Sequence, residues 1–181
     1  ALAGTYTATI DLSRLGDGTW FIGSDSVRPN ATLAAGSVLL PGAGNLYRLG
    51  GDGNTLTVSA PNLLTGTAGL QVGAPFSFGG NRFGASTTTL AQANSYSGPT
   101  TVNRSSILKI QRGGVAGSSL GTTSLLTVHS SAHVHAETVN GTFFDSNGNP
   151  LNVDLRGGSV LKFYNNAINT AGLNVTRWND S

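Results

Sequence analysis

Three histidines and one glutamate are the residues best suited to metal chemistry in this chain. His129, His133 and His135 are its only histidines, and Glu137 follows the last by two positions. In an extended strand, alternate side chains share a face and lie about 6.5–7 Å apart. Two imidazoles at that spacing can share a zinc or copper ion, but a complete site needs further ligands. The spacing leaves two interpretations open, a metal site and a polar strand surface.

The segment from Asp145 to Pro150 imitates the start of a calcium-binding loop. An EF-hand loop needs glycine at its sixth position and a bidentate glutamate at its twelfth. Here the glycine falls at position four and Arg156 stands at position twelve. We therefore expect a turn, in which Asn147 and Gly148 supply the positive φ that a tight turn requires.

Paired carboxylates would indicate an enzyme that cleaves carbohydrates. The acidic residues are Asp11, Asp17, Asp25, Asp52, Glu137, Asp145, Asp154 and Asp180. Most lie near Gly, Ser or Asn, and no Asp-Asp or Asp-x-x-Asp pair occurs. A phosphate-binding loop is also missing from the sequence. We expect these acids at corners of the fold, and we predict no catalytic, cofactor-binding or metal-binding residues and no enzyme.

Aromatic residues and glycosylation motifs complete the set of candidate sites. The aromatic residues that could stack on sugars are Trp20, Phe21, Tyr47, Phe76, Phe78, Phe83, Phe143 and Phe144. The local cluster at 75–83 is expected to fill a loop or an end of the core rather than bind a ligand. N-glycosylation sequons begin at Asn30, Asn103, Asn140, Asn174 and Asn179, and they matter only in a cell that glycosylates the protein.

The elements that must position these residues are short strands. The chain has 181 residues, 26 glycines and 10% charged residues, against about 25% in a typical protein. Apolar and polar residues alternate in short runs, including the expected strands 5–12 and 18–24, and turn residues recur about every 8–12 positions, which is typical of a sandwich, a barrel or a β-helix. The run 31–40 is expected to be extended, because Gly36 interrupts it and Pro41-Gly42 ends it. We predict a single all-β domain over residues 1–181.

Charge and residue usage exclude several functional classes. The net charge is +2 and the arginines are scattered singly, so nucleic acid is not an expected partner. No apolar run approaches the roughly 20 residues of a membrane span. Cysteine and methionine are both missing, which excludes thiolate chemistry and indicates a processed product or an excised segment.

The junctions between strands favour a solenoid over a sandwich. A sandwich built from hairpins should show many two-residue Asn-Gly or Asp-Gly connections. Most junctions here are longer and rich in glycine, as in 111–123. Apolar–polar–apolar triplets recur at 56–58, 108–110, 126–128 and 161–163, each with two side chains directed inward. We therefore predict a parallel β-helix (β-solenoid), with a β-sandwich as the alternative.

The segment from Ala93 to Val134 resembles the passenger-associated transport repeat, also called the autotransporter-associated β-strand repeat. The matching positions are Asn94, Tyr96, Gly98, Thr100, Val102, Leu108, Ile110, Leu120, Gly121, Leu126, Val128, Ala132 and Val134. One departure is Ser105-Ser106 where the family has glycine, which indicates a bulge or a widened corner. The resemblance implies a right-handed solenoid outside the cell or on a bacterial surface. In the register of the family Ala132, Val134 and Ala136 face inward, so His133, His135 and Glu137 face outward together.

The function expected from the sequence is structural. No capping helix is visible at either terminus, so the end strands invite self-association into filaments. The alternatives are a stalk or adhesin segment of a larger autotransporter-like passenger and, third, a carbohydrate-active solenoid. Surface polysaccharide is a possible partner, and a membrane span is not expected. For His133, His135 and Glu137 we expect an exposed polar face rather than a metal site.

Overall fold

The structure, a computed structural model, is built from parallel strands. It describes residues 1–51, 53–75, 86–111, 117–137, 147, 149 and 151–163, together with the backbone of 174–178. The described residues form fifteen strands and one 3₁₀ turn, η1 (Leu12–Arg14), with no α-helix among them. Every strand pairs in parallel with its neighbours. The prediction of a β-solenoid is confirmed, and the sandwich alternative is wrong.

The strands form two large sheets and one small one. The seven-stranded sheet contains β1 (Gly4–Tyr6), β3 (Ala31–Leu33), β6 (Thr55–Val58), β8 (Thr87–Leu90), β10 (Ile107–Ile110), β12 (His133–Ala136) and β14 (Val160–Phe163). The six-stranded sheet contains β5 (Leu46–Leu49), β7 (Gly69–Val72), β9 (Thr100–Val102), β11 (Leu126–Val128), β13 (Asn152–Arg156) and β15 (Asn174–Trp178). The small sheet pairs β2 (Thr9–Asp11) with β4 (Val38–Leu40).

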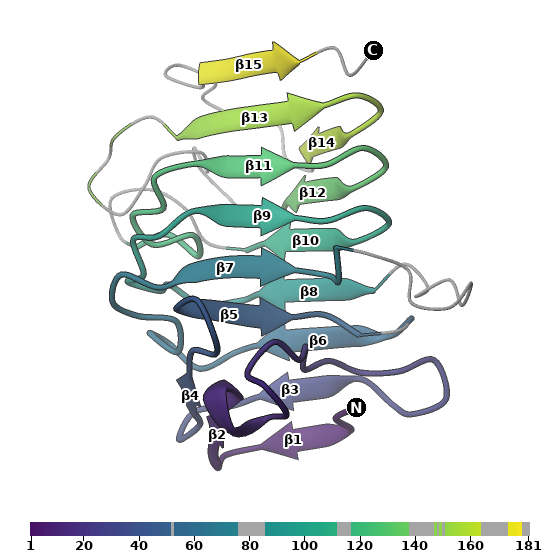
Figure 1. The fold of residues 1–181 in the computed structure, drawn as a ribbon, viewed down its shortest axis with the longest axis vertical. Coiled ribbons are helices and arrows are strands. Elements are labelled where there is room, and N and C mark those ends of the chain that lie inside the picture. The colour runs from purple at the N-terminus through teal and green to yellow at the C-terminus, as the bar shows by residue number, and fades with distance from the viewer. Residues whose placement is uncertain are drawn as a thin grey trace.

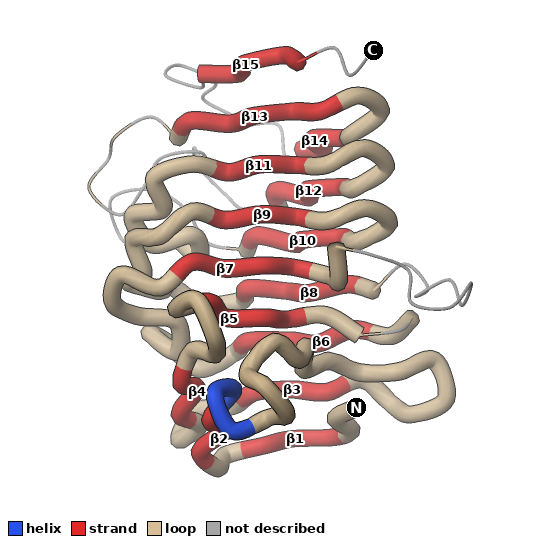
Figure 2. The backbone as a smooth tube through the Cα atoms, viewed as in Figure 1, coloured by secondary structure: helices blue, strands red, loops and turns tan. Residues whose placement is uncertain are grey.

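The chain winds as a right-handed coil. Strands of the six-stranded sheet run across the front of Figure 1 in one direction, and strands of the seven-stranded sheet return behind them while the chain climbs from N to C. Right-handed crossovers are the rule for parallel strands, because the twist of the strands favours that hand. The loops gather along the two sides of the stack, where they form the corners (Figure 2).

Stacked rows of apolar side chains fill the space between the two sheets. Leu56, Leu108 and Val134 belong to one inward row, and each is 0–1% exposed. The inward pairs expected from the sequence, Leu108 with Ile110 and Leu126 with Val128, are fully buried. Each strand is too short to bury its own apolar face, so the core forms only when successive coils stack.

The Asn-x-Tyr-x-Gly-x-Thr segment joins neighbouring coils through buried polar contacts. Asn94 accepts a hydrogen bond from the Leu64 N–H (3.0 Å) and donates from Nδ2 to the Ser119 carbonyl (3.0 Å). The buried Tyr96 hydroxyl lies 2.7 Å from Thr100 Oγ1. Burial raises the pKa of Tyr96, although the Thr100 hydrogen bond opposes the shift. These side chains satisfy the backbone where the chain turns inside the stack.

One corner between the two large sheets repeats in three successive coils. Ser105 and Ser131 both have φ of 60°, and Gly158 at the equivalent position has φ of 71°. The Ser105 N–H donates to the Ser131 carbonyl at 3.3 Å, which links two of these corners. Ser105 thus occupies a left-handed position that usually favours glycine, and it lies in the corner where the sequence predicted a change.

Two segments near the N-terminus differ from the sequence prediction. The run 5–12 was expected to alternate as one strand, but it divides into β1 and β2, which belong to different sheets. The run 18–24 was expected to be a strand, yet it contributes one isolated bridge, between Ile22 and Leu49. The extended prediction for 31–40 is confirmed by β3 and β4. Alternation in the sequence could not show where the chain turns a corner between sheets.

Candidate functional site

The three histidines are divided between the two large sheets. His129 follows β11, whereas His133 and His135 lie in β12, beyond the corner at Ser131. The rings of His133 and His135 are 5.9 Å apart and tilted by 44°. Ala132, Val134 and Ala136 are buried. The predicted outward direction of His133 and His135 is therefore confirmed, and His129 does not join them.

Glu137 is held by the neighbouring strand rather than by the histidines. Its carboxylate lies 3.0 Å from Lys109 Nζ and accepts a hydrogen bond from Gln111 Nε2 at 3.1 Å. Burial alone would raise the pKa of Glu137, but the hydrogen bonds from Lys109 and Gln111 outweigh it, so the pKa is lowered. The carboxylate therefore stays ionised and engaged at neutral pH.

The expectation of an exposed polar face is wrong for His135, which occupies a nearly covered and positively charged position. Its side chain is 9% exposed, and its register partners in the adjacent strands are Lys109 and Lys162. Burial lowers the pKa of His135, and His133, Lys109 and Lys162 lower it further, while Glu137 opposes them. Among the described residues no group of three or more His, Cys, Asp or Glu side chains could hold a metal ion. The outward row can take up a proton, and its lysines disfavour a bound cation.

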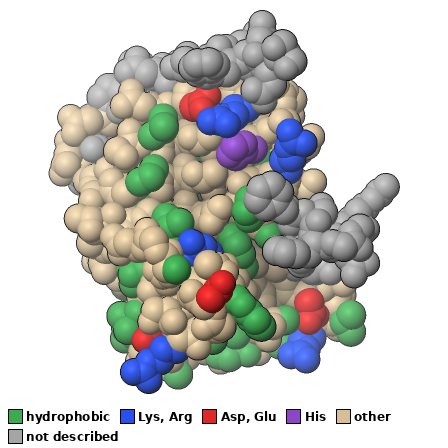
Figure 3. Space-filling model, in the orientation of Figure 1, with side chains coloured by type: hydrophobic (Ala, Val, Ile, Leu, Met, Phe, Trp, Pro, Cys, Tyr) green, Lys and Arg blue, Asp and Glu red, His purple; other side chains and the backbone are tan. Residues whose placement is uncertain are grey.

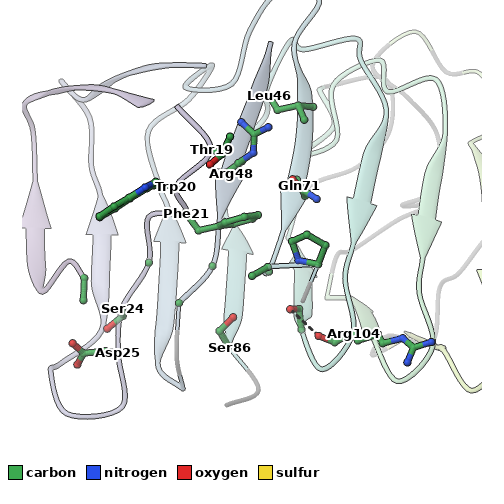
Figure 4. A pocket seen from close by; sticks show the side chains of 18 residues that line it. Thr19, Trp20, Phe21, Ser24, Asp25, Leu46, Arg48, Gln71, Ser86 and Arg104 are labelled. Atoms are coloured by element: carbon green, nitrogen blue, oxygen red, sulfur yellow. Dashed lines mark hydrogen bonds between the residues drawn. The ribbon is translucent and has the colours of Figure 1, made fainter. Parts of the chain in front are cut away.

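A groove on the other side of the fold is the larger candidate site. Its volume is about 880 Å³, within the usual range of ligand pockets. It follows the outer face of β5 and β7 and the corners beside them (Figure 4). Its polar and aromatic lining includes Thr19, Trp20, Phe21, Ser24, Asp25, Arg48, Gln71, Ser86, Arg104 and Ser106.

Arg48 is the central charged group of the groove. It projects from the outer face of β5, is 9% exposed, and has Gln71 of β7 as its register partner. Nη1 donates to the Gly18 carbonyl (3.0 Å) and to the Ala43 carbonyl (2.8 Å). These bonds fix the guanidinium through Nη1 in a residue that lines the groove. No carboxylate among the described residues forms a salt bridge with it.

The segment that carries Trp20 and Phe21 is fixed by a carboxylate-capped turn. Asp17 accepts hydrogen bonds from the Thr19 N–H (3.0 Å) and the Thr19 hydroxyl (2.5 Å). These bonds hold the pKa of Asp17 below its ordinary value. Trp20 follows this turn and is 63% exposed, an unusual exposure for a large apolar side chain. The face of the molecule in Figure 3 carries only scattered charged side chains.

Ser86 places an unsatisfied hydroxyl in the wall of the groove. The residue is 1% exposed, and its Oγ has no hydrogen-bond partner within the described part of the chain. A buried hydroxyl without a partner is costly, so it calls for a specific explanation. Neither Ser86 nor Arg48 was a candidate from the sequence. The signal for Arg48 was present, because a charged residue stands between the apolar residues of 46–49.

The aromatic and acidic residues singled out from the sequence lie in different environments in the structure. Trp20 and Phe21 line the groove, whereas Tyr47 is 2% exposed in the core. Asp11, Asp17 and Asp25 cap turns, as expected. Asp154 is a correction, because it lies within strand β13 and is paired with Arg156 (3.2 Å). The predictions for Asp52, Phe76, Phe78, Phe83, Phe143, Phe144, Asp145, Gly148, Pro150 and Asp180 fall outside the described residues.

The asparagines of the N-glycosylation sequons also lie in different environments. Asn30 is exposed, and its Oδ1 accepts a hydrogen bond from the Thr55 N–H at 3.0 Å. Asn103 is 5% exposed, and its Nδ2 donates to the Gly73 carbonyl at 2.5 Å, so a glycan there would disrupt the corner. Asn140 and Asn179 lie outside the described residues, and Asn174 is described by its backbone alone.

The fold and the groove define a parallel β-solenoid with a pocket on its outer face. Comparisons with family models, with curated proteins and with solved structures give no match. In the described part of the chain no helix is long and apolar enough to cross a membrane.

Proposed function

We propose that this chain is an extracellular structural protein whose β-solenoid subunits join end to end into filaments. The observation that supports this most is the open edge at each end of the seven-stranded sheet. Within the described residues, β1 and β14 each pair with a strand on one side only. Unpaired strand edges are templates for pairing with another chain. The resemblance of residues 93–134 to a surface-protein repeat is consistent with an extracellular site of action.

The edge at β1 has a defined hydrogen-bonding pattern. The Gly4 N–H donates to the Asn30 carbonyl (3.1 Å), and the Tyr6 carbonyl accepts from the Ala34 N–H (2.9 Å). Backbone groups in a strand alternate in direction, so Thr5 directs its N–H and C=O away from β3. Tyr6 is only partly buried although it lies in an inward row. Both the backbone and the core at this end can accept another strand.

The edge at β14 is complementary to the edge at β1. The Val160 N–H donates to the Ala132 carbonyl at 3.0 Å, so Leu161 and Phe163 direct their backbone groups outward. If Thr5 of a second copy faced Lys162, its N–H would reach the Leu161 carbonyl. This parallel register also continues the inward rows, with Tyr6 after Phe163.

The six-stranded sheet allows the same continuation. It ends at β15, and at its other end the segment at Ile22 covers β5 through a single bridge to Leu49. A second copy stacked through β1 would bring its Ile22 segment towards β15. Because the contact joins unlike ends of two copies, it does not close on itself and generates an open filament.

Substitution of Thr5 tests this function. Thr5→Pro removes the outward N–H and should leave the subunit folded, because proline is tolerated in an edge strand. We expect wild-type protein to form filaments in electron micrographs and to sediment as large species, and Thr5→Pro to remain monomeric. Thr5→Val keeps the N–H and is the matched control that should still assemble. Monomeric wild-type protein at high concentration, or filaments of Thr5→Pro, would contradict the proposal.

A second candidate function is a stalk segment within a larger autotransporter-like passenger. The same two edges favour it, since further coils of one polypeptide could continue the stack. Mass spectrometry of the native product separates the two candidates. Termini near Ala1 and Ser181 support a separate subunit, and peptides that extend beyond these residues support the passenger segment.

A further inference from the structure

We propose that the groove beside Arg48 binds an acidic oligosaccharide, a short chain of uronate sugars. The inference is independent of filament formation, because the groove lies on the outer face of β5 and β7 rather than at an end of the seven-stranded sheet. Its volume of about 880 Å³ is sufficient for a ligand of several rings.

The charge of the groove favours a carboxylate ligand. Arg48 and Arg104 are both lining residues, but the Arg104 side chain is directed away from Arg48 and Phe21 (Figure 4), so Arg48 supplies the positive charge of the groove. Asp25 is the only acid among the described lining residues, and its carboxylate is already engaged by the Arg28 side chain (3.6 Å) and the Arg28 N–H (2.7 Å). The charge of Arg48 acts on Asp17, whose pKa it helps to lower, but no carboxylate of the described lining is paired with it. Arginine binds carboxylates well because its planar N–H groups match the two oxygens.

The remaining lining favours a sugar over a simple anion. Trp20 and Phe21 lie side by side along one wall of the groove (Figure 4) and provide apolar surface for the C–H faces of sugar rings. Gln71 presents an amide beside Arg48. Ser86 belongs to the same wall, but its hydroxyl is covered, so a ligand in the groove would not reach it. Aromatic walls with a few convergent polar groups are typical of ligand pockets.

The groove is equipped for binding rather than cleavage. Hydrolysis of a glycosidic bond by the usual route needs two carboxyl groups on opposite sides of the bond. Asp25 alone among the described lining residues carries one. The bound oligosaccharide should therefore be released unchanged.

Calorimetric titration with tetragalacturonate tests the proposal, with the fully methyl-esterified tetramer as the neutral control. We expect binding of the acid, weaker binding at high salt, and about tenfold weaker binding of the ester, because a charge-assisted contact is lost. Trp20→Ala replaces an exposed side chain and Gln71→Ala removes the amide beside Arg48, and each should weaken binding about tenfold. Arg14→Gln replaces an exposed arginine outside the groove and should bind as wild type.

Three results would overturn the proposal. The first is no heat with millimolar tetragalacturonate. The second is equal affinity for the acid and its ester, which would mean that the Arg48 guanidinium does not bind the ligand carboxylate. The third is unchanged binding in both Trp20→Ala and Gln71→Ala, which would place the ligand elsewhere. Arg48→Gln is informative where its circular dichroism matches wild type, because this side chain also holds two backbone carbonyls.

Discussion

Individual side chains have roles set by the direction in which each strand position points. Leu108 and Ile110 face the core and are 0% exposed, whereas Lys109 between them reaches Glu137 on the outer face. The alternation of a strand therefore places neighbours in the sequence in opposite environments. A substitution at 108 and one at 109 should differ sharply in their effect on stability.

Leu108→Ala should lower the free energy of unfolding by about 2–5 kcal/mol, because it removes buried methyl groups and leaves a cavity. Lys109→Ala removes a partly exposed ion pair and should cost less than about 1 kcal/mol. Urea denaturation of the three proteins measures both values. Equal losses for the two variants would show that position 108 is not part of a packed core.

His135 should make the stability of the fold depend on pH. Its folded pKa is lowered from 6.5, and the charged groups around it are His133, Lys109, Lys162 and Glu137. The unfolded chain then binds more protons than the folded chain as the pH falls through the unfolded value. Stability should therefore fall below about pH 6.5 and level off below the folded pKa.

The variant His135→Gln isolates this effect. It cannot take up a proton, so unfolding curves between pH 7 and pH 5 should show a smaller loss of stability than in wild type. Glu137 acts in a lower window, because its pKa is lowered from 4.5 and its contribution is lost only on further acidification. An identical pH slope in wild type and His135→Gln would contradict the assignment.

Strands and corners act as repeated units that the coils share. The corner at Ser105, Ser131 and Gly158 is left-handed in each of three coils, so the turn of the backbone keeps its shape while the residue changes. A left-handed conformation costs a residue with a side chain roughly 1–2 kcal/mol, and glycine avoids that cost. Serine carries this strain at two of the three corners.

Gly158→Ala and Gly157→Ala form a matched pair for the corner. An added Cβ meets nothing within 4 Å at Gly157 and only the Ser131 nitrogen at 4.0 Å at Gly158, but Gly158 alone has a left-handed φ, of 71°. We expect Gly158→Ala to lose about 1–2 kcal/mol of stability and Gly157→Ala to be nearly neutral. Thermal or urea unfolding measures the difference, and equal effects would show that the left-handed corner is not strained.

The whole molecule behaves as a stack in which each coil contacts its neighbours. Central strands have partners on both sides, whereas β1 and β14 have one described partner each. In such quasi-one-dimensional folds the stability of a coil depends on its neighbouring interfaces. The ends of the stack should therefore open more readily than the middle.

Hydrogen exchange of the monomeric Thr5→Pro variant should show this gradient. Amides of β8 and β10 should exchange slowly, and those of β1 and β14 should exchange at least about tenfold faster, because end strands can open without disrupting the rest. In wild-type filaments, the amide of Leu161 should become protected if β14 pairs with β1. Uniform exchange along the monomer would indicate a single cooperative unit instead of a graded stack.

The local sequence pattern was sufficient to predict some features of this protein. The triplets at 108–110 and 126–128 identified the inward pairs, since alternation is a property of one strand and its buried face. Glycine-rich junctions in place of tight hairpins identified a solenoid. The register around Val134 also placed His133 and His135 on the outer face.

Other features were decided only by tertiary structure, because they depend on which coils lie beside each other. The sequence could not show that a corner separates His129 from the other histidines, or that Lys109 and Lys162 flank His135. The groove depends even more clearly on tertiary structure. Trp20, Arg48 and Ser86 are far apart in the chain and meet only because successive coils stack in register. Spacing along one strand predicts a shared face, but a site assembled from several coils needs the winding of the chain.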